Sequence, residues 1–336
     1  MSGGKEGKIR TWRIQDGKEV GMPMNAERAV WDVAVSPDGK WIVSGTRNGF
    51  VLWNAESHEK LTEFKHTGYV YAVDVSPDGT KIVSGSGDYT AFVWSLSTGQ
   101  RLLGPLQHDY WVVAVKFSPD GRLIATATRV RDSVRVYDSQ NGHLLVDVPI
   151  QVFSSFNQSL TWARDGKQLF ALSRDGNIHC LDPSRGITLS KWPIHSSNGA
   201  ECIALESNGT WIATSAGSSV SFWNTTTRKQ IGSVIEHGER IWSMAISETN
   251  DLMVCGDKSI TLTPLSDTPL VATLIKTVQE LRTDLGNFQR KANQEKDSFR
   301  EILRLLRADL HSKETSPSAF IITLAHVPLT ASLLYR

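Results

Sequence analysis

Short runs of β-branched and aromatic residues alternate with polar turn residues along most of the chain. In one unit the runs cover residues 70–75, 81–86 and 90–95, and Gly-Asp-Tyr separates the last two. Runs of this length and spacing are typical of antiparallel strands joined one after another. Because no helical periodicity occurs before residue 270, the pattern predicts an all-β domain.

A four-residue turn motif divides the runs into units of similar length. The clear copies read Ser-Pro-Asp-Gly and the later ones are degraded, and they begin at Ser36, Ser76, Ser118, Ala163, Glu206 and Ser247. Proline at the second position and glycine at the fourth suit a type I turn. The glycines of the first five copies lie 40, 42, 45 and 43 residues apart. A period of about 40–45 residues with four short strands per unit is typical of a β-propeller blade.

Four residues of the best-preserved unit carry a resemblance to a known family. His66, Ser84, Asp88 and Trp94, together with the turns, resemble the WD40 repeat family over about residues 5–265. The resemblance implies a hydrogen-bonded network of these four side chains. In that network the aspartate fixes the histidine tautomer, and the buried indole N–H finds its acceptor. The next unit keeps most of the set: His108, Thr126, Asp132 and Tyr137.

The strands do not divide into a whole number of blades. Six sets of inner, second and third strands begin near residues 28, 69, 110, 156, 200 and 240. A lone third strand at 8–14 and an outer strand at about 18–22 precede them. We favour a propeller with seven blade positions whose first blade is incomplete, with residues 2–7 ending a second strand and the gene model starting late. The alternative is six blades that close with residues 17–22 as the outer strand of the last blade.

The composition changes after residue 264, and a heptad pattern follows. Its apolar seam consists of Val278, Leu281, Leu285, Phe288, Phe299, Ile302 and Leu306. We therefore divide the chain into a WD40 propeller at 1–267, an amphipathic α-helix at 268–314 and a poorly ordered apolar tail at 315–336. The heptad pattern predicts one of two roles for the helix. It forms a coiled coil, for self-association or partner capture, or it packs on the incomplete blade.

The apolar tail is the one segment that raises the question of a membrane. Residues 319–335 contain no Lys, Arg, Asp or Glu. The stretch is short for a membrane span, and Pro328 and several hydroxyl side chains weaken it further. A tail anchor is therefore the weaker interpretation.

Charge and cysteine content narrow the function classes. The 336 residues include 36 Lys and Arg against 35 Asp and Glu, which offers no net charge for binding nucleic acid through many phosphates. Cys180, Cys202 and Cys255 form no disulfide pattern and indicate buried thiols in a reducing compartment. No secretory signal opens the chain. We therefore expect the protein to be located in the cytoplasm, with the nucleus as the alternative.

The residue patterns of catalytic and metal sites are missing from the sequence. No glycine-rich phosphate loop precedes a helix, and no Gly-x-Ser-x-Gly elbow lies between a strand and a helix. The nine histidines lack the spacing of metal ligands. The aspartates of the turn motifs form a row, but the turn explains each of them. The sequence therefore predicts a protein that is not an enzyme and uses no metal or cofactor.

The resemblance also implies where partners bind. In WD40 propellers the loops before the inner strands and the tight turns between second and third strands share one face, here called the top face. The residue at the start of the inner strand, seven positions before each turn motif, is implied to contact peptide partners. These positions include Tyr69, Trp111, Phe156 and Arg240, and the tight turns add Arg47, Arg131 and Arg174.

Aromatic and arginine side chains dominate interface energetics. We therefore expect these seven residues to bind a protein or peptide that has an acidic segment and an apolar anchor. The alternative is that the rings pack at the mouth of the channel.

These observations predict a non-catalytic protein–protein interaction scaffold. The alternative function is the WD40 sensor region of a fungal immune-type receptor, detached from its nucleotide-binding domain. Closely similar repeats with variable surface residues are typical of such arrays.

Overall fold

Antiparallel strands follow one another along the chain, as the alternating pattern predicts. The computed structural model describes residues 1–13, 18–129, 133–150, 152, 159–194, 201–206, 208–247, 252–256, 260–265 and 283. Contacts divide the chain into two units, residues 1–274 and 275–336. The described strands all belong to the first unit. The helix seam and the apolar tail lie outside the described residues.

The described strands form seven antiparallel sheets. The first sheet has three strands: β1 (Ser2–Gly3), β2 (Lys8–Trp12) and β3 (Glu19–Asn25). The second has four: β4 (Asp32–Val35), β5 (Trp41–Thr46), β6 (Gly49–Asn54) and β7 (Lys60–Lys65). The third also has four: β8 (Val70–Val75), β9 (Lys81–Ser86), β10 (Thr90–Ser95) and β11 (Arg101–Gln107).

The later sheets repeat the same order. The fourth sheet consists of β12 (Val112–Phe117), β13 (Leu123–Thr128), β14 (Val134–Asp138) and β15 (Leu144–Val148). The fifth consists of β16 (Leu160–Trp162), β17 (Leu169–Leu172), β18 (Asn177–Asp182) and β19 (Ile187–Pro193). The sixth consists of β20 (Cys202–Leu205), β21 (Trp211–Ala216), β22 (Ser219–Asn224) and β23 (Gln230–Glu236). The seventh has three described strands: β24 (Ser243–Ile246), β25 (Leu252–Gly256) and β26 (Ile260–Pro264).

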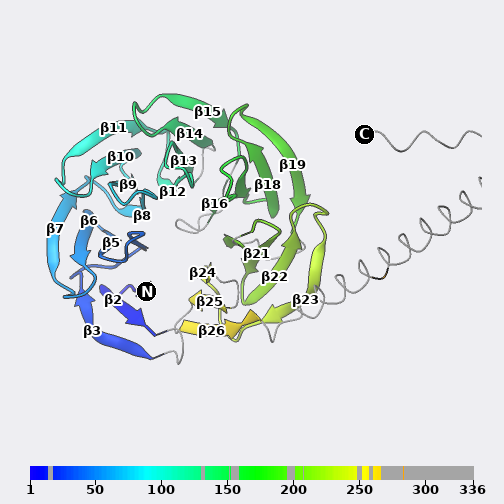
Figure 1. Cartoon of the computed structure of the whole chain (residues 1–336), viewed down its shortest axis with the longest axis horizontal. Coiled ribbons are helices and arrows are strands. Elements are labelled where there is room, and N and C mark those ends of the chain that lie inside the picture. Colours follow the sequence, from blue (N-terminus) through cyan, green and yellow to red (C-terminus); the bar gives the residue numbers. More distant parts are fainter. Residues whose placement is uncertain are drawn as a thin grey trace, which may run out of the picture. The chain divides into compact units, whose positions relative to one another are not determined.

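Within residues 1–274 the sheets follow each other around a ring in chain order (Figure 1). Inner strands such as β8, β12 and β24 lie toward its middle, and outer strands such as β7, β11 and β19 lie on its circumference. Consecutive strands within each sheet are antiparallel, so short turns suffice to connect them. This arrangement is a β-propeller, as the repeat predicts.

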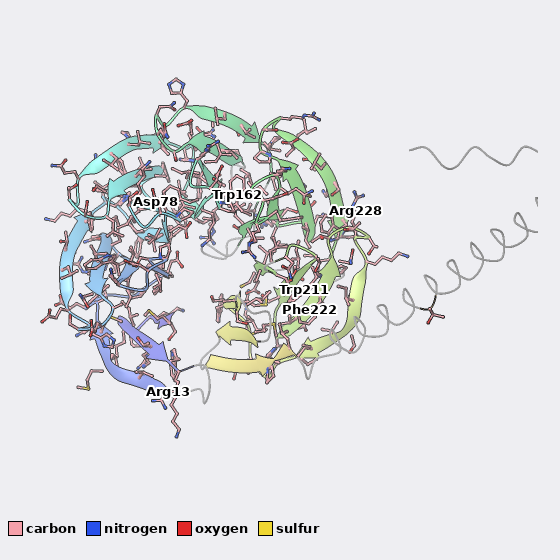
Figure 2. The ribbon with its side chains drawn as sticks, viewed as in Figure 1. Arg13, Asp78, Trp162, Trp211, Phe222 and Arg228 are labelled. Carbon is pink, nitrogen blue, oxygen red and sulfur yellow. The ribbon has the colours of Figure 1, made fainter. Side chains whose placement is uncertain are left out.

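Apolar side chains of neighbouring sheets form the core. Val43 and Phe50 of the second sheet, for example, share one buried cluster with Val70 and Val73 of the third. Trp211 and Phe222 of the sixth sheet lie side by side (Figure 2), with ring centroids 5.4 Å apart. Both faces of the inner strands β8 and β12 are largely buried, which explains their nearly continuous apolar sequences.

The turn motifs have a common geometry. Ser36 Oγ donates a hydrogen bond of 2.6 Å to Asp38 Oδ1, which also accepts the backbone N–H of Lys40 at 3.1 Å. Gly39 has φ of 71°, a left-handed value that favours glycine. The Ser76 and Ser118 turns repeat the serine–aspartate contact. The turn thus accounts for these aspartates without a functional role.

Residues 19–25 belong to the first sheet, because β3 pairs with β2 through Thr11 opposite Val20 and Trp12 opposite Glu19. They are therefore not the outer strand of the last sheet. Ser2 takes the place of Ser44 and Ser84, since the indole N–H of Trp12 donates to Ser2 Oγ at 2.9 Å. Among the described strands the arrangement matches seven blade positions with three strands in the first, and residues 17–22 do not close the last blade in the way that the six-bladed alternative required.

Candidate interaction surface

Aromatic side chains gather where three consecutive inner strands begin. They form a continuous series of ring contacts, here called the aromatic surface: Trp31, Tyr69, Tyr71, Tyr89, Tyr110 and Trp111. Tyr69 and Tyr71 are stacked with centroids 5.8 Å apart, and Trp31 meets both edge-on. Tyr71 then contacts Trp111, whose ring centroid is 5.6 Å away. The structure therefore links Tyr69 and Trp111 through Tyr71.

Two arginines lie over the rings of this surface. The guanidinium carbon of Arg47 is 5.6 Å from the ring centroid of Tyr69, and that of Arg129 is 5.2 Å from the ring centroid of Trp111. Both arginines come from the region between second and third strands. Tight turns and inner-strand starts therefore share one face, as the resemblance implies. Arg47 is exposed and Arg129 is half-buried.

The other predicted site residues lie elsewhere or outside the description. Arg240 forms an ion pair with Glu201: its Nε lies 2.8 Å and its Nη2 2.6 Å from Glu201 Oε1. The guanidinium carbon of Arg240 also lies 4.5 Å from the ring centroid of Trp242. This contact set joins the sixth and seventh sheets. Arg174 is exposed in the turn between β17 and β18. Phe156 and Arg131 lie outside the described residues.

The sequence reasoning missed Trp31, Tyr71 and Trp242. Each lies five positions before a turn motif, two after the inner-strand start that was considered. Side chains alternate along a strand, so residues two apart lie on the same side. Counting back five residues as well as seven would have found all three.

The four-residue network occurs in the third sheet. The Nδ1–H of His66 donates to Asp88 Oδ2 at 2.9 Å, which leaves Nε2 to accept from Ser84 Oγ at 2.8 Å. Ser84 Oγ in turn accepts the indole N–H of Trp94 at 2.9 Å. Burial acts to raise the pKa of Asp88, but hydrogen bonds from His66 and Thr90 outweigh it and hold this pKa well below its usual range. The side chain of His66 is fully buried, so the network is internal.

The fourth and seventh sheets carry reduced forms of the network. His108 donates from Nδ1 to the carbonyl of Leu106 at 2.9 Å, and its Nε2 lies 2.8 Å from Thr126 Oγ1 and 3.3 Å from the Tyr137 hydroxyl. Burial lowers the pKa of His108 to about 4. In the seventh sheet Cys255 takes the serine position, with Sγ 3.8 Å from His237 Nε2. Cys180, Cys202 and Cys255 are all free and buried, as predicted.

Charged side chains connect the inner strands. Asp32 on β4 accepts the backbone N–H of Val73 on β8 at 2.8 Å, and Asp74 on β8 accepts that of Phe117 on β12 at 2.8 Å. Lys116 Nζ is 3.3 Å from Asp74 Oδ1. Burial raises the pKa of Asp32 to about 6, although Lys116 acts in the opposite direction. These groups serve inter-sheet contacts, since an inner strand has a free edge on the side away from its own sheet.

Among the described residues, His, Cys, Asp and Glu side chains form no group of three or more that could hold a metal ion. The same part of the chain contains no helix long and apolar enough to cross a membrane. The aromatic surface is the candidate site that the described residues offer.

Comparison with known proteins agrees with the fold. Residues 29–277 match the family described as the IFT122 first beta-propeller. The chain belongs to this family of WD40-type β-propellers. The WD40 resemblance inferred from His66, Ser84, Asp88 and Trp94 is thereby confirmed.

The chain is also similar in sequence to named WD40-type proteins of ribosomes and translation initiation. The small ribosomal subunit protein RACK1y of Oryza sativa subsp. japonica is 35% identical over 150 residues, which are 43% of this chain and 44% of the relative. Subunit I of eukaryotic translation initiation factor 3 from Pyricularia oryzae is 30% identical over 189 residues, or 50% and 52% of the two chains. The small ribosomal subunit protein RACK1 of Caenorhabditis elegans is 31% identical over 142 residues, or 40% and 43%.

The WD40 chain thus spans about half the length of these relatives. Their names describe subunits of assemblies and not enzymes. This agrees with the prediction that the propeller is not an enzyme.

Proposed function

We propose that this propeller is a non-catalytic scaffold that binds a protein segment on the aromatic surface of its top face. The observation that carries the proposal is the series of ring contacts from Trp31 to Trp111 across three sheets, with two guanidinium groups lying on it. Tyr69 and Trp111 are half-buried, so they are held in place yet reachable. Such pre-ordered rings lose little entropy on binding and are frequent hot spots.

The partner segment should be acidic and carry an apolar anchor. Arg47 and Arg129 already occupy the faces of Tyr69 and Trp111, so a cationic ligand would meet like charge there. Carboxylates of an acidic segment can instead accept N–H groups from the rim of either guanidinium group. The half-buried rings of Trp31, Tyr69 and Trp111 then supply apolar area for the anchor.

The relatives named as a ribosomal subunit protein and an initiation factor subunit support a role within a larger assembly. We infer a cytoplasmic multi-subunit complex as the setting, with the nucleus as the alternative. Self-association through the helix seam, and the receptor-sensor alternative, stay predictions that the described residues do not test.

Selection from a random peptide library displayed on phage, with the full chain as bait, tests the proposal. We expect the selected peptides to combine Asp or Glu with an apolar residue and to bind more weakly as salt rises. Replacing both Arg47 and Arg129 by alanine should lower their affinity at least tenfold. Arg174→Ala removes an exposed arginine from the corresponding turn of another sheet and should leave affinity unchanged. Neutral or basic peptides, or equal affinity for all variants, would overturn the proposal.

A further inference from the structure

One position of the tight turns differs between the three sheets that carry the aromatic surface. The second strands β5, β9 and β13 are followed directly by Arg47, Gly87 and Arg129. Both arginines lie over rings of the aromatic surface. The third sheet therefore has no side chain at the position from which each of its neighbours places a guanidinium group on a ring.

The backbone conformation does not account for this glycine. Gly87 has no left-handed φ, whereas Tyr89, two residues later, has φ of 71°. The φ angle alone would therefore not strain another residue at position 87. The N–H of Gly87 donates to the carbonyl of Tyr69 at 2.8 Å, and every residue except proline could make this bond. The reason for the glycine must lie in the space around it.

Tyr71 restricts that space. A Cβ at position 87 would lie 3.0 Å from Cε2 of Tyr71 and 3.6 Å from its Cζ and Oη. Carbon atoms in contact are ordinarily about 3.5–4.0 Å apart, so the ring would have to shift. Tyr71 is 6% exposed, and its ring also contacts Trp31, Tyr69 and Trp111. A side chain at position 87 would therefore displace the half-buried rings that surround Tyr71.

The arginine of the second sheet indicates where a side chain at position 87 would lie. Arg47 lies over Tyr69, which directly precedes the inner strand β8 of the next sheet. Gly87 has the same relation to Trp111, which directly precedes β12. Both Gly87 and Trp111 are half-buried, so a ligand can reach them. Trp111 keeps this exposure although Arg129 lies over its ring.

We propose that Gly87 is a specificity-determining residue of the aromatic surface, which admits an apolar anchor of leucine or phenylalanine size against Trp111. The inference rests on the proposed function. The anchor of the bound segment takes the place that a side chain at position 87 would occupy. The acidic residues of the segment pair with Arg47 and Arg129 and do not depend on Gly87.

A side chain at position 87 would act on the anchor in two ways. It would fill part of the anchor's space, and through Tyr71 it would displace Trp111, against which the anchor packs. Both effects penalise large anchors more than small ones, since a small anchor makes few contacts there. The salt dependence of binding comes from the arginines and should be unchanged.

An anchor series tests the proposal. The probe is the tightest-binding acidic peptide of the phage selection, with Ala, Val, Leu or Phe at its apolar position, and fluorescence anisotropy measures its affinity for the full chain. Wild type should bind the Leu peptide at least about tenfold more tightly than the Ala peptide. In Gly87→Ala this preference should fall below about threefold, with the Ala peptide bound as before. Gly87→Arg should also lose the preference, because arginine covers the anchor's place.

Gly238→Ala is the matched control. Gly238 is exposed, and a Cβ there would meet no atom within 4 Å, so this variant should keep the anchor preference of wild type. Equal affinity of wild type for all four peptides would overturn the proposal, and this measurement depends on no variant. A uniform loss of affinity for the four peptides in Gly87→Ala would also overturn it, because the glycine would then serve packing alone.

The outcomes separate this inference from the proposed function. If the anchor preference is missing but the double replacement of Arg47 and Arg129 by alanine still abolishes salt-sensitive binding, the role of Gly87 is refuted and the proposed function stands. If Asp and Glu of the peptide can be replaced by Asn and Gln without loss while the anchor preference still depends on Gly87, the role of Gly87 is supported and the acidic partner is refuted.

Discussion

The indole N–H of Trp94 and the hydroxyl of Ser84 are joined by a hydrogen bond of 2.9 Å. The same contact recurs between Trp12 and Ser2, Trp53 and Ser44, and Trp223 and Thr214. In each case a third-strand tryptophan is fixed to the strand next to it. Four of the seven described sheets thus share this pair, and the histidine and aspartate of the third sheet are additions to it.

Replacing Asp88 by alanine should lower the free energy of unfolding by about 1–3 kcal/mol. The change leaves the Nδ1–H of His66 and the backbone N–H groups of Thr67 and Thr90 without their acceptor. Urea denaturation measures the difference. Arg47→Ala in the corresponding tight turn should cost less than about 0.5 kcal/mol. Equal costs for the two variants would refute the network as a source of stability.

Acid should destabilise the protein through His108. Its pKa is lowered from 6.5 to about 4, so the folded state resists protonation. The stability that neutral His108 contributes is complete above pH 6.5 and is lost as pH falls toward 4, by up to about 3 kcal/mol. His108→Gln should flatten the stability curve between these pH values in urea denaturation. His143→Gln, at an exposed position, should leave the slope unchanged, and a similar flattening there would contradict the assignment.

Asp32 should have the opposite pH dependence. The pKa of Asp32 in the folded protein is about 6, above the ordinary 3.8. Its contribution to the free energy of unfolding is therefore complete below pH 3.8 and is lost as pH rises through 6. Asp32→Asn keeps an acceptor for the N–H of Val73 and removes the buried charge. We expect the variant to be about 1 kcal/mol more stable than wild type at pH 7.5 and to lose this advantage by pH 4. Thermal unfolding at both pH values checks this, with Asp109→Asn as an exposed control.

Local patterns made much of the fold predictable. The Ser76 turn and the network around Trp94 depend on residues within one unit of the repeat, so their spacing is visible in the sequence. The contact between Arg240 and Glu201 joins residues 39 apart in different sheets, and no local pattern predicts it. Arg129 was missed for a related reason. Its position over Trp111 depends on the path of a turn, which spacing alone does not determine.

The inner-strand residues show the same limit. The sequence pattern places Trp31 and Tyr71 at inner strands. Their ring contact arises only when adjacent sheets pack together. The sequence likewise indicated an incomplete first blade. It did not show that Trp242 and Val35 would be left exposed on either side of it.

The central claim is that the aromatic surface binds a partner. The most direct measurement is the affinity of a selected acidic peptide for Trp111→Ala, with Trp242→Ala as an exposed tryptophan outside the surface. Trp111 packs on Tyr71 and Tyr110, so some loss of thermal stability accompanies the change. The account predicts about 2 kcal/mol weaker binding for Trp111→Ala and unchanged binding for Trp242→Ala. A lower melting temperature with unchanged affinity in Trp111→Ala would show that the ring only packs, and would contradict the account.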